Sequence, residues 1–174
     1  MSKVRICVSG LMSNFDVYVD DRKLEPISKK RANEFIYEPE HDKKNYTIKF
    51  IQGHICDYSN WFFRGILEFF LGLLGGVGGY SDSEEYRGPY RAYCEGVIDA
   101  DKDVNINVKL IRKRKMGLLI RDKFNFEVNS DTAWKEIRNE FESPDYIRKR
   151  WNIIRIPYLI LFVLIIGILI LAFV

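Results

Sequence analysis

Residues 156–174 constrain the fold of this chain most, because they carry no charged side chain. At about 1.5 Å per residue, a helix of this stretch reaches about 28 Å, close to the roughly 30 Å hydrocarbon core of a bilayer. Backbone polar groups in lipid must be paired within the segment, which favours an α-helix. A chain of 174 residues has no core that would enclose such a helix on every side. We therefore expect a transmembrane helix at 156–174.

The residues just before this stretch are of the types found where a helix enters a membrane. Lys and Arg are enriched on the cytoplasmic side, and Trp and Tyr are enriched at the headgroup level. The predicted membrane-anchor residues are Arg148, Lys149, Arg150, Trp151, Arg155 and Tyr158. This pattern predicts a tail-anchored, single-pass membrane protein with a cytoplasmic N-terminal domain and its C-terminus on the far side.

The charge balance and the cysteines exclude other classes of protein. The chain has 27 basic and 24 acidic residues, and its net charge of +3 is too small for a nucleic-acid-binding protein. The N-terminus has no apolar run typical of a signal peptide. Cys7, Cys56 and Cys94 are odd in number and widely spaced, which favours reduced thiols in a cytosolic domain over disulfides.

Apolar and polar residues alternate at period two through much of the chain, which predicts β-strands. The clearest runs lie at 4–8, 15–19, 46–50, 92–99 and 104–110. Polar turn-forming residues separate the early runs at intervals of about ten residues, a rhythm typical of a small antiparallel β-sandwich.

Two of these runs carry a resemblance to a known family. The stretch 17–24, Val-Tyr-Val-Asp-Asp-Arg-Lys-Leu, and the later strand 45–50, Asn-Tyr-Thr-Ile-Lys-Phe, resemble the PEGA-type β-sandwich modules. In those modules a V-x-V-D-G turn precedes a closing strand, and here Asp21 takes the place of the turn glycine. The resemblance covers the N-terminal third and implies a non-catalytic β module, of a kind often found beside membrane spans.

Two helices are expected after the strands. Trp134, Ile137 and Phe141 share one face when drawn as a helix, which predicts a short amphipathic helix that packs on the sheet. The sequence Ser143-Pro144-Asp145 is a helix cap with proline at the first helical position, so a second helix is expected to run from there into 156–174. The expected fold class is α+β: a small antiparallel β-sandwich with a short amphipathic helix and a C-terminal transmembrane helix.

A second hydrophobic stretch, 61–79, interrupts the β pattern. Each glycine costs a solvated helix about 1 kcal/mol relative to alanine, so its glycine-rich face favours close backbone packing or lipid. The residues predicted for helix packing or membrane insertion are Phe62, Phe69, Phe70, Gly72, Gly75, Gly76 and Gly79. Three interpretations stay open: a helix in or re-entering the membrane interface, a second membrane span, and a glycine-rich loop or core helix of the soluble domain.

These features divide the chain into one soluble domain and its attachments. The segments are a first β-rich half at 1–57, the glycine-rich hydrophobic segment at 58–80, a second β-rich half at 81–128, a helical juxtamembrane connector at 129–155, and the anchor at 156–174.

The sequence lacks the groups that most enzymes need. His54 and Cys56 would share one face of a strand and are candidate zinc ligands, but no C-x-x-C motif or second histidine pair accompanies them. There is no G-x-S-x-G motif and no Walker-type loop. We therefore predict no catalytic residue, no metal, no cofactor, no nucleic acid and no small-molecule substrate.

The remaining features point to lipid and protein partners. A basic run is the candidate site for anionic lipid, and it consists of Arg112, Lys113, Arg114 and Lys115. The leading hypothesis is a non-enzymatic adaptor or subunit of a membrane complex, with a lipid bilayer and a protein partner or a second copy bound through the glycine-rich segment. The alternative is a membrane-perturbing or membrane-remodelling protein that acts through 61–79. An enzyme that uses carboxylates is a third class.

Overall fold

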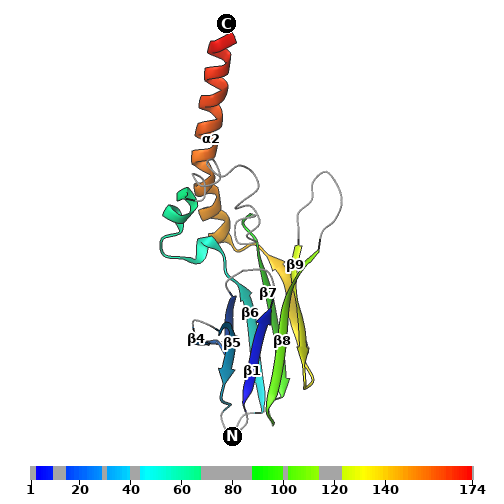
Figure 1. The fold of residues 1–174 in the computed structure, drawn as a ribbon. Coiled ribbons are helices and arrows are strands. Elements are labelled where there is room, and N and C mark those ends of the chain that lie inside the picture. Colours follow the sequence, from blue (N-terminus) through cyan, green and yellow to red (C-terminus); the bar gives the residue numbers. More distant parts are fainter. Residues whose placement is uncertain are drawn as a thin grey trace. The chain divides into compact units, whose positions relative to one another are not determined.

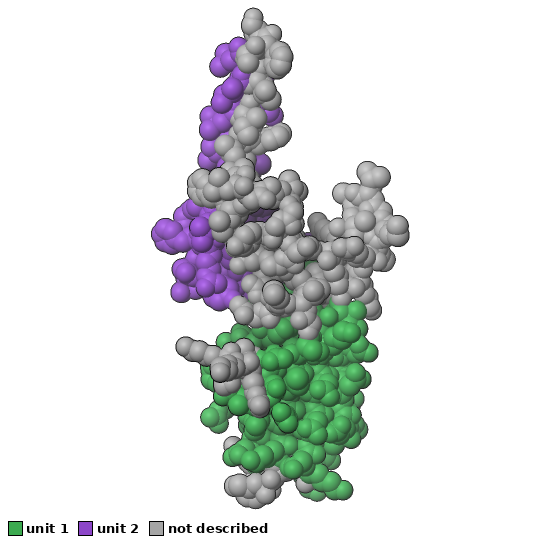
Figure 2. Space-filling model, in the orientation of Figure 1, with its two compact units in different colours: residues 1–53, 91–142 green, residues 54–90, 143–174 purple. Residues whose placement is uncertain are grey.

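The structure is a computed structural model, and it describes residues 3–9, 15–28, 31–39, 44–67, 88–99, 102–113 and 123–173. The chain forms two compact units (Figure 2). The first unit comprises residues 1–53 and 91–142, and the second comprises residues 54–90 and 143–174.

The first unit contains two five-stranded sheets (Figure 1). The strand order of one sheet is β4 (Pro26–Ser28), β5 (Arg31–Tyr37), β1 (Val4–Ser9), β8 (Val104–Lys113) and β9 (Lys123–Ser130). The order of the other is β10 (Lys135–Glu142), β7 (Arg91–Asp99), β6 (Asn45–Gln52), β2 (Phe15–Val19) and β3 (Arg22–Lys23). The β-rich character predicted from the alternation of apolar residues is confirmed.

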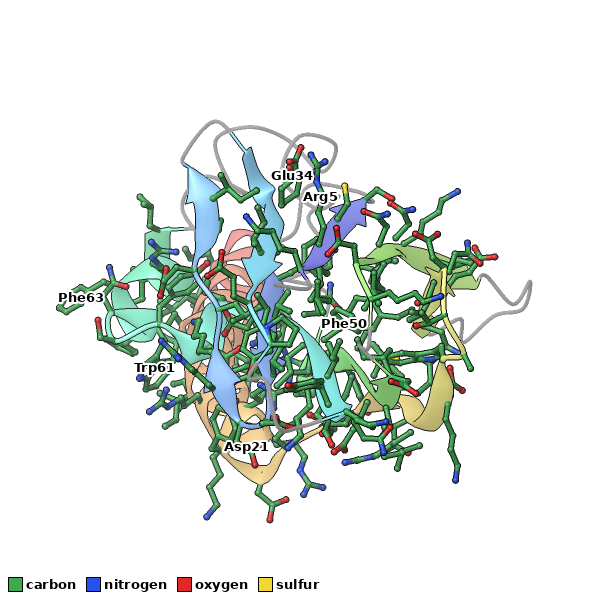
Figure 3. The ribbon with its side chains drawn as sticks, turned by 90° about the horizontal axis from the view of Figure 1, so that it is seen from below. Arg5, Asp21, Glu34, Phe50, Trp61 and Phe63 are labelled. Atoms are coloured by element: carbon green, nitrogen blue, oxygen red, sulfur yellow. The ribbon has the colours of Figure 1, made fainter. Side chains whose placement is uncertain are left out.

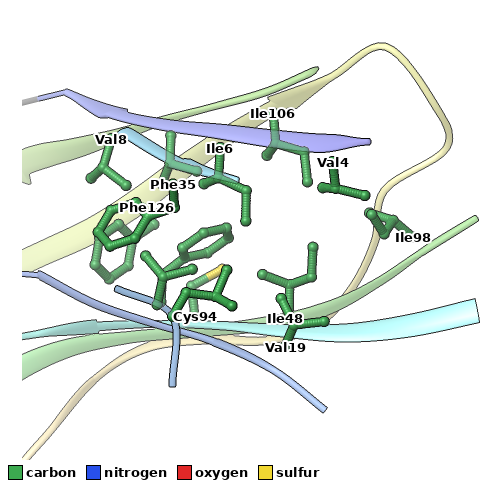
Figure 4. Close-up of a cluster of buried hydrophobic side chains, with 14 of the residues drawn as sticks. Val4, Ile6, Val8, Val19, Phe35, Ile48, Cys94, Ile98, Ile106 and Phe126 are labelled. Atoms are coloured by element: carbon green, nitrogen blue, oxygen red, sulfur yellow. The ribbon is translucent and has the colours of Figure 1, made fainter. Parts of the chain in front are cut away.

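The apolar positions of the alternating runs form one core. Val4, Ile6 and Val8 of β1 point inward, and Ile48 and Cys94 from the other sheet lie opposite them (Figure 4). These side chains are at most 1% exposed. Complete burial of a valine or isoleucine side chain contributes roughly 1.5–3 kcal/mol to stability. Period-two alternation therefore builds the sandwich, because it supplies each sheet with one apolar face.

The prediction of an antiparallel sandwich is wrong for one pair of strands. Strand β1 pairs with β8 in parallel, with Val4 opposite Val104 and Val8 opposite Val108. Alternation of side chains fixes which face of a strand is buried, but it is the same for parallel and antiparallel neighbours. The long chain segment between β1 and β8 allows the second strand to return in the same direction.

The expected amphipathic helix around Trp134, Ile137 and Phe141 is wrong, because residues 135–142 form strand β10. The register of β10 on β7 shifts between Glu136 and Arg138, which makes Ile137 the extra residue of a β-bulge. This insertion breaks the period-two pattern and leaves apolar residues at spacings of three and four, which resemble a helical face.

The Trp134 ring, just before β10, packs closely on Gly96 of the neighbouring strand β7. A Cβ atom on Gly96 would lie 2.3 Å from the Trp134 ring, so glycine is the residue that admits the indole here. The indole also lies 5.9 Å from the ring of Phe50, centroid to centroid.

The second unit contains a short 3₁₀ helix, η1 (Ile55–Asp57), the helical residues 61–67, and α2 (Asp145–Phe173). Helix α2 begins at Asp145, one residue after the predicted first position, Pro144. The Ser143 hydroxyl does not cap the helix as predicted, because it donates to Pro89 O. In the described part of the chain, however, no helix combines the length and the apolar character that crossing a bilayer requires. The prediction of a transmembrane helix at 156–174 is therefore wrong. The described residues of this stretch continue α2, whose first turns are charged and pack on other residues of the unit.

Candidate functional site

Two segments of the second unit, residues 54–67 and 145–155, share a small hydrophobic core. We call these two segments together the collar. Ile55 and Cys56 of η1 pack against Ile147 and Ile154 of α2, and all four are at most 5% exposed. Trp61 and Trp151 are partly buried and pack against this cluster. The charged first turns of α2 therefore have a specific protein partner within the chain.

Both ring nitrogens of His54 are hydrogen-bonded, and one of them caps η1. Its Nδ1 atom accepts a hydrogen bond from Cys56 N at 3.0 Å, so the ring proton lies on Nε2, which donates to Gly88 O at 2.7 Å. The His54 backbone N–H donates to Asp57 Oδ2 at 2.9 Å and completes a capping box. The imidazole is fully buried and packs edge-on against Trp151. His54 is thus a structural group of the collar.

Polar contacts tie the same two segments together at their surface. Tyr146 Oη donates to Asp57 Oδ1 at 2.5 Å, and Arg150 Nη1 donates to Cys56 O at 2.6 Å. The Arg150 guanidinium also lies 5.4 Å from the centroid of the Trp61 ring, within the range of a cation–π contact. Because these contacts join residues roughly ninety positions apart, they fix segment 54–67 on α2.

Gly65 allows the helical residues 61–67 to lie directly on α2. A Cβ atom on Gly65 would stand 2.7 Å from Ile154 Cδ1, which is closer than real side chains approach. The absence of a side chain at Gly65 therefore sets the distance between the two helical segments.

The outer side of the collar is apolar and unusually exposed. Phe63 is 75% exposed, Leu67 is 57% exposed, and Phe62 is 38% exposed. Figure 3 shows Phe63 pointing away from the ribbon. Large apolar side chains that are exposed together usually mark a binding surface.

The rest of α2 extends this apolar surface. Its exposed apolar side chains beyond the collar are Ile156, Leu159, Ile160, Val163, Leu164, Ile166, Ile168, Ile170 and Leu171. At about 100° per residue they cover more than half of the helix circumference. This is wider than the roughly 100° stripe by which an amphipathic helix packs on one protein surface.

The predicted membrane-anchor residues have different roles in the collar. Arg150 and Trp151 are half-buried and form its internal contacts. Arg148 is exposed and pairs with Asp145, whereas Lys149 and Arg155 are exposed and have no ion-pair partner among the residues that the structure describes. The remaining anchor residue is Tyr158, whose side chain lies outside the described part of the structure.

Most of the other predicted site residues lie outside the described residues. Of the residues predicted for helix packing or insertion, Phe62 belongs to the helical residues 61–67. The residues of that group outside the description are Phe69, Phe70, Gly72, Gly75, Gly76 and Gly79. Of the candidate anionic-lipid residues, Arg112 and Lys113 are described as the end of β8 without their side chains, and Arg114 and Lys115 are outside.

The thiols of the chain have no metal-site geometry in the described part. No group of three or more His, Cys, Asp or Glu side chains there is placed to hold a metal ion. Burial raises the pKa of Cys56 and that of Cys94 to about 12, so both thiols keep their protons at neutral pH. The candidate pair His54 and Cys56 is used instead to cap η1.

Sequence reasoning missed the residues that build the collar, above all Gly65 and Ile154. A signal was present, since Gly65 stands within an aromatic run where only close packing favours glycine.

No protein-family model, no curated protein and no solved structure matches the chain.

Proposed function

We propose that this chain is a non-enzymatic adaptor that associates with a lipid bilayer through α2 and presents its β-sandwich to a protein partner. The observation that carries the proposal is the exposed apolar surface of α2 beyond the collar. Exposed apolar area costs roughly 25 cal/mol per Å² relative to burial, so this surface favours an apolar environment.

The width of that surface favours lipid over a protein groove. A helix that docks in a groove needs one apolar stripe, and its other face is polar. Leu164 and Ile166 lie about 160° apart around α2, with Val163 between them, and all three are at least 40% exposed. Lipid chains at the membrane interface can cover an apolar face of this width without a preformed groove.

The sandwich supports the adaptor part of the proposal through an ordered polar surface on β6, β7, β10 and the turn between β2 and β3. Lys49 lies between Asp21 and Glu95, at 2.5 Å and 3.8 Å respectively. Tyr93 donates to Glu95 at 2.8 Å, and the Arg138 guanidinium lies 4.7 Å from the Tyr93 ring centroid. Neighbouring strands thus hold these side chains in fixed positions, which lowers the entropy cost of recognising a partner.

A flotation assay tests the lipid association. The full chain is mixed with phosphatidylcholine vesicles and centrifuged through a density gradient, and the fraction that floats is measured. We expect the parent chain to float and the double substitution Val163→Lys with Leu171→Lys to reduce the floating fraction at least tenfold. The matched control is Ile36→Lys, because Ile36 is an exposed apolar residue of the sandwich, and it should float like the parent. Equal flotation of all three proteins would overturn the proposal.

Membrane perturbation by segment 61–79 is a second candidate function, and the exposure of Phe63 favours it. An aromatic side chain that projects from a helical segment beside an apolar helix is suited to insertion between lipids. Release of a trapped dye from vesicles by the full chain, abolished by Phe63→Ser, would support this activity. Intact vesicles at saturating bound protein would exclude it and leave the adaptor proposal standing.

A further inference from the structure

We infer that the collar is a headgroup-binding surface that selects anionic lipids, an inference that rests on the proposed association of α2 with a bilayer. The occupant is the phosphate layer of an anionic membrane. The carrying observations are the excess of cations on the collar, their position directly before the apolar part of α2, and the apolar side chains that project beside them.

Cations outnumber anions on the collar. The cations are Arg64, Arg148, Lys149, Arg150 and Arg155, and the anions are Asp57 and Asp145. Both anions are already in use within the collar, since Asp57 accepts from Tyr146 and Asp145 pairs with Arg148. The collar therefore carries a net positive charge, which is complementary to phosphate.

Lys149 and Arg155 are the cations available to a ligand. Both are exposed, and neither has an ion-pair partner in the described ranges of the chain. They point to different sides of α2, so together they can contact headgroups around the helix. Arg150, by contrast, is engaged with Cys56 O and two aromatic rings.

The cations of α2, which lie within residues 148–155 and which we call the basic band, come directly before the apolar part of the helix. Beyond the collar, the exposed apolar side chains of α2 begin at Ile156, immediately after the band. If the apolar surface lies against lipid chains at the membrane interface, the band is therefore close to the headgroups.

The helical residues 61–67 add an apolar contact at the same level. Gly65 packs on Ile154, one residue before Arg155, so this segment lies beside the basic band. Phe63 and Leu67 project from it and are mostly exposed. Trp61 and Trp151 lie within the collar, and indole rings are favoured at the headgroup level. The collar thus combines basic, aromatic and apolar side chains, which are the types that contact the headgroup region of a membrane.

Vesicle binding at two lipid compositions tests the inference with the full chain. The probes are phosphatidylcholine vesicles and vesicles in which about one third of the lipid is phosphatidylserine. A basic residue near an anionic surface contributes about fivefold in affinity. We expect the parent chain to prefer the anionic vesicles at least tenfold at 0.1 M salt, and to lose most of this preference at 0.5 M salt because the charges are then screened.

Two double substitutions test whether the preference for anionic vesicles comes from the cations of the collar or from positive charge elsewhere on the chain. Lys149→Gln with Arg155→Gln should abolish most of the anionic preference and leave binding to phosphatidylcholine unchanged. Lys102→Gln with Lys109→Gln removes the same charge from exposed positions of the sandwich unit and should change neither. Circular dichroism and melting temperature confirm that each variant is folded. The substitution Phe63→Ser should weaken binding to both kinds of vesicle.

The outcomes separate this inference from the proposed function. Equal binding of the parent chain to both vesicles, or equal loss of preference in both double variants, overturns the selectivity of the collar and leaves lipid association intact. Failure to bind either vesicle overturns the lipid association and the inference together.

Discussion

The side-chain amide of Asn139 on β10 forms both hydrogen bonds that a neighbouring strand would form with Phe126 on β9. Phe126 N donates to Asn139 Oδ1 at 3.2 Å, and Asn139 Nδ2 donates to Phe126 O at 2.7 Å. Strand β9 is the last of its sheet, so these peptide groups would otherwise be open to another chain. Asn139 therefore joins the two sheets and covers an edge at the same time.

Substitution of Asn139 should both destabilise the sandwich and expose this edge. We expect Asn139→Ala to lower the free energy of unfolding by about 1–3 kcal/mol, because two backbone groups of Phe126 lose their partners. Asn139→Asp should cost at least as much, since a carboxylate cannot donate to Phe126 O. Urea unfolding measures the cost, and light scattering measures association. Asn107→Ala is the control, because Asn107 is exposed on the outer face of β8 and its loss should cost under about 0.5 kcal/mol. Equal costs for both alanine variants would contradict the bridge.

The turn between β2 and β3 is strained at Asp21. Both turn residues have a positive φ, 48° at Asp20 and 65° at Asp21, as in a type I′ hairpin turn, whose second position favours glycine. We expect Asp21→Gly to stabilise the chain by about 0.5 kcal/mol and Asp21→Val to destabilise it by about 1–2 kcal/mol. The ion pair of Asp21 with Lys49 does not reverse the sign, because Asp21 is 81% exposed and such pairs contribute little. Urea midpoints of the two variants test this, and a lower midpoint for Asp21→Gly would show that the ion pair dominates.

Sequence reasoning predicted the strands in which buried apolar residues alternate regularly with polar ones. Ile6 and Ile106, for example, occupy inward positions in runs of period two, so the runs at 4–8 and 104–110 appear as β1 and β8. Strand β10 could not be found in this way, because the bulge at Ile137 changes the spacing of its apolar residues. The parallel pairing of β1 and β8 depends on the path of the whole chain, which local spacing does not contain.

The collar was harder to predict because it depends on contacts between distant segments. His54 and Cys56 have the spacing of a strand face, but the His54 ring accepts from the Cys56 N–H and starts η1 instead. Gly65 is explained only by Ile154, which lies far along the sequence. Of the site, sequence reasoning identified the basic and aromatic residues of α2 and named 61–79 as a packing or membrane segment, but it did not predict that residues 61–67 pack on α2.

The three cysteines should differ sharply in reactivity. Cys56 and Cys94 are buried, and burial raises the pKa of each thiol to about 12, whereas Cys7 is partly exposed on β1. We expect a disulfide reagent such as DTNB to modify one thiol in the folded chain at pH 8, and all three in denaturant. The variant Cys7→Ser should show no rapid reaction when folded. Rapid labelling of Cys56 in that variant would show that the collar opens readily.

Alkaline pH should destabilise the chain through Tyr93. Burial and the hydrogen bond to Glu95 raise the pKa of Tyr93 from 10.0 to about 12. Between these values the unfolded chain loses this proton and the folded chain keeps it, so the free energy of unfolding falls as pH rises from about 10 to 12. At pH 7 we expect Tyr93→Phe to be less stable than the parent, because the Glu95 bond is lost. The difference should shrink as the pH rises through this window, and melting curves at matched pH measure it. A difference that is constant with pH would contradict the assignment.

The packing of Gly65 on Ile154 reverses the effect expected of a helical glycine. Helix propensity alone predicts that alanine stabilises such a position by about 1 kcal/mol. Because a Cβ atom at Gly65 would lie 2.7 Å from Ile154, we expect Gly65→Ala to destabilise the second unit by about 1–3 kcal/mol. Gly167 of α2 is the matched control, since a Cβ atom there has no neighbour within 4 Å, and Gly167→Ala should be neutral or stabilising.

A double substitution identifies the cause of that reversal. Ile154→Val removes one methylene from the side chain that Gly65 faces, so it should cost less in the Gly65→Ala background than in the parent chain. Hydrogen exchange at the amides of residues 61–67 measures this locally, because protection there reports how firmly the segment is held on α2. Faster exchange in Gly65→Ala, partly restored in the double variant, would place the effect at this contact. If Gly65→Ala instead slows exchange, propensity outweighs packing, and segment 61–67 is not held against Ile154 as closely as the structure has it.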